Sequence, residues 1–336
     1  MTVITRQEVA TYAAMIQRMQ DEASGKAEGA VRRWMSLHPD CTPAELRNAT
    51  IAIVDDVVAD YGLAVSSLAC DLYDGTMAGR GFPLADPWDG DCSAEIRRAV
   101  RYQLRKHLDG DDDAYRTAVN DMTQYYVRRY ANETTMANCA RDHRQYLHAG
   151  LDDDTSPQHG PLHQPLDRQG TPSAGTPEAY QTRYYRRRTR ADALDIGAPA
   201  FARVPTGIET CTYCLMLASR GFAYHTRESA GHADHRGCNC MIVPGCKGDA
   251  VEGVDEGALY NAWRDLEAFE AYVKKHPDEY SKDEVEARKK EIVGSYGDSV
   301  MVSTEPASVR KLLATKGGAG SLWNEPRSRM ASNFMP

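Results

Sequence analysis

The chain has 336 residues, of which 42% are hydrophobic and 26% are charged, and its formal net charge is -8 at pH 7. This length exceeds what one hydrophobic core usually organises, so we expect two or three domains of ordinary soluble composition. The negative net charge argues against non-specific binding of nucleic acid by the whole chain, because a polyanion would be repelled. No apolar window long enough for a membrane helix and no signal-peptide pattern is seen in the sequence, so we expect a protein kept in a reducing cytosol.

Helical patterns run through residues 1–149, which predict an N-terminal helical bundle. Apolar residues at three- and four-residue spacing predict a helix over 6–37. Thr42, Pro43 and Glu45 then form a capping box with proline in the first turn, which predicts the start of a long, more apolar helix at the centre of the bundle.

A third helix is expected to begin after Ser93 as its N-cap and to end near Leu108, and a fourth to cover about 114–146. The third helix carries five basic residues, which we interpret as a solvated face: Arg97, Arg98, Arg101, Arg105 and Lys106.

Residues 150–177 are rich in Pro, Gly and Asp and predict a flexible linker. A basic run interleaved with tyrosine follows, and its side chains are candidates for contact with nucleic acid or with an acidic partner protein: Arg183, Arg186, Arg187, Arg188 and Arg190. An exposed helix face explains the same pattern, so both interpretations stay open.

The strongest chemical signal lies in residues 178–250. Cys211-x2-Cys214 is followed, after twenty residues, by His235-x2-Cys238-x-Cys240. Two close pairs of soft or borderline ligands are typical of a tetrahedral structural zinc site, so we predict one zinc ion per chain. Five candidates compete for four places: Cys238 repeats the x2 spacing, whereas Cys240 could face the same way two residues along a strand.

The residues around these ligands predict a small α+β unit. Strands are expected at 201–204, 222–224 and 240–243, with a short helix over 215–219 that ends at Gly221. Cys246 is a weaker reserve ligand. The remaining cysteines are far apart and are interpreted as ordinary thiols.

Catalytic interpretations of the same segment are alternatives. An open zinc site could use Glu209, Glu228 or Asp234 as a base, and a cysteine protease could pair Cys211 or Cys214 with His235. Because nearly every nucleophile is already spaced as a metal ligand, the pattern favours a structural role, and we predict no enzymatic activity.

The segment also resembles a known family. The run from Ala202 to Gly207, the two cysteine groups, the bridge 217–221, and Val243-Pro244 resemble the Mu protein F-like, or phage head morphogenesis, proteins of tailed bacteriophages, of the type found in phages and prophages of actinobacteria. The resemblance covers about 195–265. Asn239 departs from the arginine common at that position, and the insertion 150–176 is peculiar to this chain.

This resemblance implies a minor capsid protein associated with the portal, acting in procapsid assembly or in DNA packaging or ejection. It implies portal, capsid and scaffold proteins as partners, with packaged DNA as a further one, and a place in the virion after synthesis in the bacterial host cytoplasm. A zinc-dependent hydrolase or nuclease delivered by the phage is the alternative, and a bacterial DNA-binding regulator is a lesser one.

Residues 251–336 predict a C-terminal helical region. Helices are expected over 252–272, from the capping box of Ser281 and Glu284, and after Thr304. The sequence therefore predicts a mainly α protein with a zinc-stabilised α+β segment between an N-terminal bundle and C-terminal helices.

Overall fold

The structure is a computed structural model that describes residues 3–149, 197–206, 210–230 and 240–302. In these ranges the chain is mainly helical, with two small two-stranded sheets. The predicted linker, the basic run at 183–190 and the helix expected after Thr304 lie outside the described residues. No helix in the described ranges is long and apolar enough to cross a membrane.

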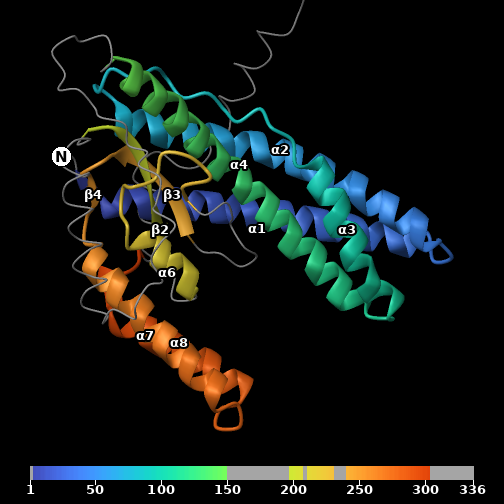
Figure 1. Cartoon of the computed structure of the whole chain (residues 1–336). Coiled ribbons are helices and arrows are strands. Elements are labelled where there is room, and N and C mark those ends of the chain that lie inside the picture. Colours follow the sequence, from blue (N-terminus) through green and yellow to red (C-terminus); the bar gives the residue numbers. More distant parts are fainter. Residues whose placement is uncertain (1–2, 150–196, 207–209, 231–239, 303–336) are drawn as a thin grey trace, which may run out of the picture.

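The predicted N-terminal bundle is confirmed as helices α1 (Arg6–Leu37), α2 (Pro43–Met77), α3 (Ser93–Leu108) and α4 (Asp112–Ala149). The helix α4 contacts each of the other three (Figure 1). The apolar positions expected for α1 are buried on its inner side: Val9, Ala13, Ile16 and Met19.

The helix starts follow from capping chemistry. At α2, the Glu45 N–H donates to Thr42 Oγ1 at 3.3 Å and the Thr42 N–H donates to Glu45 Oε2 at 2.8 Å, which confirms the predicted capping box. The helix α1 begins with a capping box of the same kind, formed by Thr5 and Glu8.

The predicted cap of α3 is wrong by one residue. Cys92 is the N-cap and makes no side-chain capping bond, whereas Ser93 is already helical. The Ser93 N–H donates to Asp91 Oδ1 at 2.7 Å, and the Ser93 hydroxyl donates to Asp55 Oδ1 on α2 at 2.6 Å. A tertiary hydrogen bond therefore takes the hydroxyl that local pattern assigned to capping.

Helices α2 and α4 approach closely along much of their length. Gly62 on α2 faces the ring of Tyr130 on α4, and a Cβ atom at position 62 would lie 2.8 Å from that ring. Further along the same interface, the buried Tyr73 hydroxyl donates to Asp142 Oδ2 at 2.7 Å. The close packing of α2 on α4 thus requires a glycine at position 62, and it includes a buried hydrogen bond between Tyr73 and Asp142.

The principal sheet joins β2 (Pro199–Pro205) and β3 (Cys240–Cys246) in antiparallel register, with Phe201 opposite Pro244. Phe201 exchanges its backbone hydrogen bonds with Tyr224, at 2.8 and 3.4 Å, on the side away from β3. Phe201 and Pro244 therefore form a non-hydrogen-bonded pair of the antiparallel ladder. At such a position the backbone N–H that proline lacks is not needed for pairing with β2. This explains why β3 continues through Pro244 to Cys246, beyond the predicted end at residue 243.

Both faces of this sheet are buried. Ala202, Val204 and Val243 on one face join the main core of the bundle, and Phe201 and Ile242 on the other join a second cluster. The strand expected over 222–224 is reduced to the single bridge at Tyr224. Burial of both faces accounts for a run of apolar residues without alternation.

The second sheet was not predicted, because each strand has only two residues. In it β1 (Val3–Ile4) pairs in parallel with β4 (Ala250–Val251), which joins the start of the chain to the segment after β3. A strand of two residues is too short to show a periodic pattern in the sequence. It becomes a strand only by pairing with a segment that is distant along the chain.

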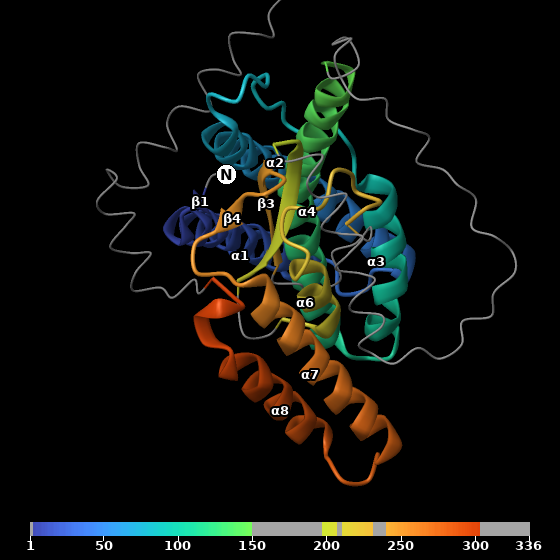
Figure 2. The same cartoon turned by 60° about the vertical axis from the view of Figure 1, so that its left-hand side comes forward.

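The helices that follow begin with α6 (Thr212–Ala218), which contacts β2 and α7 (Glu256–Lys275). The predicted capping box of Ser281 and Glu284 is confirmed at the start of α8 (Lys282–Ser295). Helices α7 and α8 form a hairpin that extends away from the bundle (Figures 1 and 2). The helix α7 begins at residue 256 and not at 252, since β4 and a turn precede its N-cap Asp255.

Candidate metal centre

The first cysteine pair forms a knuckle at the start of α6. Cys211 is the N-cap of this helix, and its Sγ accepts a hydrogen bond from the Cys214 N–H at 3.3 Å. This bond holds both side chains at one end of the helix. The predicted pairing of two ligands in one tight turn is therefore present in the backbone geometry.

The third thiol comes from the neighbouring strand. Cys240 is the first residue of β3, opposite Pro205, and lies on the same face as Ile242. Cys214 is 1% exposed and Cys240 is fully buried, and together with the partly buried Cys211 they form a small cluster separate from the three larger cores. The fold thus brings together three of the five predicted ligands.

The other two predicted ligands, His235 and Cys238, lie outside the described residues. The described chain on either side of them is anchored, since both Ala230 and Cys240 are fully buried. His225 approaches the sheet, with its Nδ1 2.9 Å from the Pro199 carbonyl oxygen, and Arg227 forms an ion pair with Glu133 of α4 at 3.2 Å.

The described residues alone do not make a complete metal site. Within the ranges given above, no group of three or more His, Cys, Asp or Glu side chains is arranged to hold a metal ion. Three clustered thiols are nevertheless the donor chemistry that zinc favours, and a tetrahedral site needs a fourth ligand. The donor set fits zinc if His235 or Cys238 supplies that ligand.

Cys246 lies at the far end of β3 from Cys240, opposite Pro199, roughly 20 Å away along the strand. It packs in a different cluster, with Cys139 and Tyr73. Burial raises the pKa of its thiol, and the nearby Arg80 guanidinium opposes this effect. The structure therefore separates this reserve ligand from the other three thiols.

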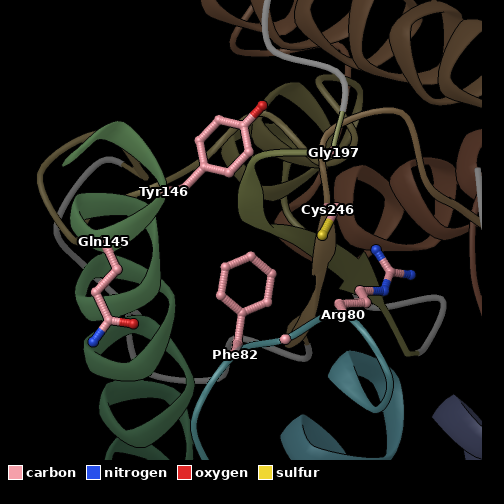
Figure 3. Close-up of a pocket in the computed structure, with 7 residues that line it drawn as sticks. Arg80, Phe82, Gln145, Tyr146, Gly197 and Cys246 are labelled. Atoms are coloured by element: carbon pink, nitrogen blue, oxygen red, sulfur yellow. The ribbon is translucent and has the colours of Figure 1, made fainter. Parts of the chain in front are cut away.

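A cavity of about 610 Å³ opens beside Cys246 (Figure 3). Arg80, Phe82, Tyr146 and Gly197 contribute to its lining, from segments far apart in the sequence. Arg80 Nη2 lies 2.8 Å from Asp249 Oδ2, so the cationic wall of the cavity is already paired with a buried carboxylate. Sequence reasoning missed this hollow, because no local pattern joins its segments.

Of the three acids proposed as a catalytic base, the structure describes one. Glu209 and Asp234 lie outside the described residues, whereas Glu228 is exposed in the turn after Tyr224. The basic residues Arg183, Arg186, Arg187, Arg188 and Arg190 also lie outside the described part of the chain.

One stabilising contact of the knuckle had no sequence signal. The Thr212 hydroxyl donates to Glu270 Oε1 on α7 at 2.9 Å, and Lys289 of α8 forms an ion pair with the same carboxylate at 3.0 Å. The cysteine knuckle is thereby linked directly to the C-terminal hairpin.

Comparison with known proteins identifies a family. The sequence model of a family described as VG15 protein matches residues 3–149 and 172–266, well over half of the chain. The second match ends at Leu266, the last buried residue of α7. The Gene 15 protein of Mycobacterium phage D29 is 35% identical over an alignment of 74 residues, and the match covers 13% of this chain and 27% of the phage protein. The chain thus spans about a quarter of the length of that curated relative, and no solved structure matches the chain.

The family match includes the whole N-terminal bundle, the cysteine knuckle and β3. The family match and the phage relative support a bacteriophage origin for the chain. The chain belongs to the VG15 protein family.

Proposed function

We propose that this chain is a minor capsid protein that acts in phage head morphogenesis, in contact with the portal. The family match and the mycobacteriophage relative support a virion or morphogenesis role. The finer assignment rests on the resemblance of the segment around Cys211 and Cys240 to Mu protein F-like proteins. In this proposal the protein acts in procapsid assembly or in DNA packaging or ejection, and it resides in the capsid interior or at the portal vertex.

The proposal includes one structural zinc ion, held by four of Cys211, Cys214, His235, Cys238 and Cys240. The observation that carries it is the packing of Cys211, Cys214 and Cys240 into one separate cluster. Because Cys240 already contacts this cluster, we favour it over Cys238, with His235 as the fourth ligand.

The role of the ion would be to tie α6 to β3. The helix has only seven residues, so it is too short to be stable by itself. Zinc ligands in small domains contribute folding free energy directly, because the unfolded chain has no preformed site. Four protein ligands would also leave no open position for a substrate or an activated water, which is the reason to propose no enzymatic activity.

The basic residues Arg183, Arg186, Arg187, Arg188 and Arg190 are proposed to contact the portal or packaged DNA. Arginine suits both partners, since its planar guanidinium pairs with carboxylates and with phosphates.

The experiment that tests the assembly role is deletion of the gene from a phage that encodes it, with complementation from a plasmid. We expect loss of filled heads without the gene, rescue by the parent chain, and detection of the protein in purified virions by mass spectrometry. Normal virion yield after deletion, with no copies of the protein in purified particles, would overturn the proposal.

The alternative, a zinc-dependent hydrolase or nuclease, makes a separate prediction. Nuclease and peptidase assays on the parent, Glu209→Gln and Asp234→Asn proteins would detect an activity that either substitution abolishes. A structural zinc ion predicts no activity in any of the three proteins.

A further inference from the structure

The helix α3 lies at the outer edge of the N-terminal bundle (Figures 1 and 2). It packs on α2 and α4 through a narrow apolar side that includes the buried residues Ile96, Val100 and Leu104. Most of its remaining side chains are exposed.

That outer surface carries two parallel rows of side chains at four-residue spacing. One row is Arg97, Arg101 and Arg105, and the other is Arg98, Tyr102 and Lys106. All six side chains are exposed. Successive members of a row rise by about 6 Å along the helix, so each row covers about 12 Å of its length.

Within the described residues, these cations form no salt bridges: Arg97, Arg98, Arg101, Arg105 and Lys106. The only acid on α3 is Glu95, three residues before Arg98, and its Oε1 lies 3.5 Å from Arg129 Nη1 of α4. Asp91 lies just before the helix, and the hydrogen bonds with Ser93 lower the pKa of its carboxyl more than Arg97 does.

The arrangement costs the helix stability. Like charges three or four residues apart on a helix repel, which applies to Arg97 with Arg101 and to Arg101 with Arg105. Arg105 and Lys106 are in the last turn, where the helix dipole favours cations, but this effect does not reach the other three. A solvated face would be as soluble with mixed charges, so the uniform sign is better explained by an anionic partner.

An exposed aromatic ring interrupts the second row. Tyr102 is 67% exposed, and the Arg105 guanidinium lies 5.9 Å from the centre of its ring. This contact restrains a long flexible side chain with its charge still accessible, which lowers the entropy lost when the guanidinium binds.

We propose that this basic face of α3 binds the phosphate backbone of double-stranded DNA without reading its sequence. Duplex DNA presents about one negative charge per 1.7 Å of its axis, which matches an unpaired row of cations better than the sparse carboxylates of a protein surface. Arginine, which supplies four of the five cations, can also bind a phosphate through two parallel hydrogen bonds. Asp109 and Asp111 follow the helix and limit the face at its C-terminal end.

This surface is built from other residues than the thiol cluster and the basic run at 183–190, so the inference goes beyond the proposed function. The presence or absence of the zinc ion does not affect it.

The test is fluorescence anisotropy with a labelled DNA duplex of mixed sequence, repeated over a series of salt concentrations. The parent is compared with a triple variant, R97Q/R101Q/R105Q, which removes one row. Since each phosphate contact contributes roughly 0.9 to the slope of log K against log salt, we expect the slope to fall by about 2.7. The affinity at low salt should fall by about tenfold or more.

Two further variants make the result specific. The control K274Q/K275Q/K282Q removes three exposed lysines from the α7–α8 hairpin, changes the net charge equally, and should leave the slope unchanged. The charge-preserving variant R97K/R101K/R105K should keep most of the slope. Circular dichroism checks that each variant is folded, and R98Q/K106Q tests the second row separately, with an expected fall in slope of about 1.8.

An unchanged slope in both glutamine variants of α3 would overturn the proposal and would leave an acidic protein surface as the partner of this face. An equal loss in the lysine control would also overturn it, because bulk charge alone would then explain the binding.

Discussion

Replacing Gly62 with alanine tests the close approach of α2 and α4. In the interior of a helix this change normally stabilises a protein by about 1 kcal/mol, because alanine has the higher helix propensity. At position 62, however, the new Cβ would lie 2.8 Å from Cγ, 2.8 Å from Cδ2 and 2.9 Å from Cδ1 of Tyr130. Carbon atoms in contact prefer a separation of about 3.5–4.0 Å, so the ring or the helix must move by roughly 1 Å.

The ring of Tyr130 has little room to move. It is 7% exposed, and Trp88 packs against it with ring centroids 4.8 Å apart. Overpacking of a close-packed core costs about 1–3 kcal/mol. Because the Tyr130 ring is held against Trp88, we expect a cost in the upper half of that range, about 2–3 kcal/mol. After subtraction of the propensity gain, Gly62→Ala should lower the free energy of unfolding by about 1–2 kcal/mol.

Urea denaturation followed by circular dichroism measures this effect as a lower midpoint at unchanged slope. Two glycines serve as matched controls, because no atom lies within 4 Å of the position a Cβ would take: Gly75 on α2 and Gly25 on α1. Alanine at either control position should raise the midpoint. In a Tyr130→Ala background, Gly62→Ala should lose its cost, since the ring it meets is gone.

A Gly62→Ala protein as stable as the parent, or stabilised like the two controls, would refute this account of the α2–α4 interface. So would the same loss in the presence and absence of the Tyr130 ring.

Two further predictions concern buried and capping polar groups. Tyr73→Phe removes the buried hydrogen bond to Asp142 and should cost about 1.5–3 kcal/mol in urea denaturation, because the acceptor is a charged carboxylate; an unchanged midpoint would contradict this. At the start of α2, hydrogen bonds from Thr42 hold the pKa of Glu45 below its usual value of 4.5. This contribution is therefore present above pH 4.5 and lost as the pH falls through the lowered pKa, so the stability difference between the parent and Glu45→Gln should shrink on acidification, whereas a difference constant with pH would contradict the assignment.

Local signals predicted much of the helical frame. The helix over 6–37 and the capping boxes at Thr42 and Ser281 are found as predicted, because periodicity and capping depend on residues close in sequence. Ser93 shows the limit of such reasoning, since its hydroxyl is engaged by Asp55 of another helix.

The sequence indicated the candidate ligands by residue type and spacing, but it did not indicate which of their side chains lie together in space. The spacing of Cys211 and Cys214 indicated a shared turn, which is present. Whether Cys240 could join them depended on the register of β3 against β2, which no local pattern specifies. Cys246, close in sequence, lies at the opposite end of the strand for the same reason.

The most direct test of the proposed zinc centre is the metal content of the purified full chain, measured by inductively coupled plasma mass spectrometry on the parent and three variants. We predict about one zinc ion per chain for the parent, and the same content for Cys246→Ser, which removes a buried thiol distant from the cluster. Cys240→Ser should lose the zinc and Cys238→Ser should keep it. A parent without zinc would contradict the account, and so would a Cys240→Ser protein that binds zinc as the parent does.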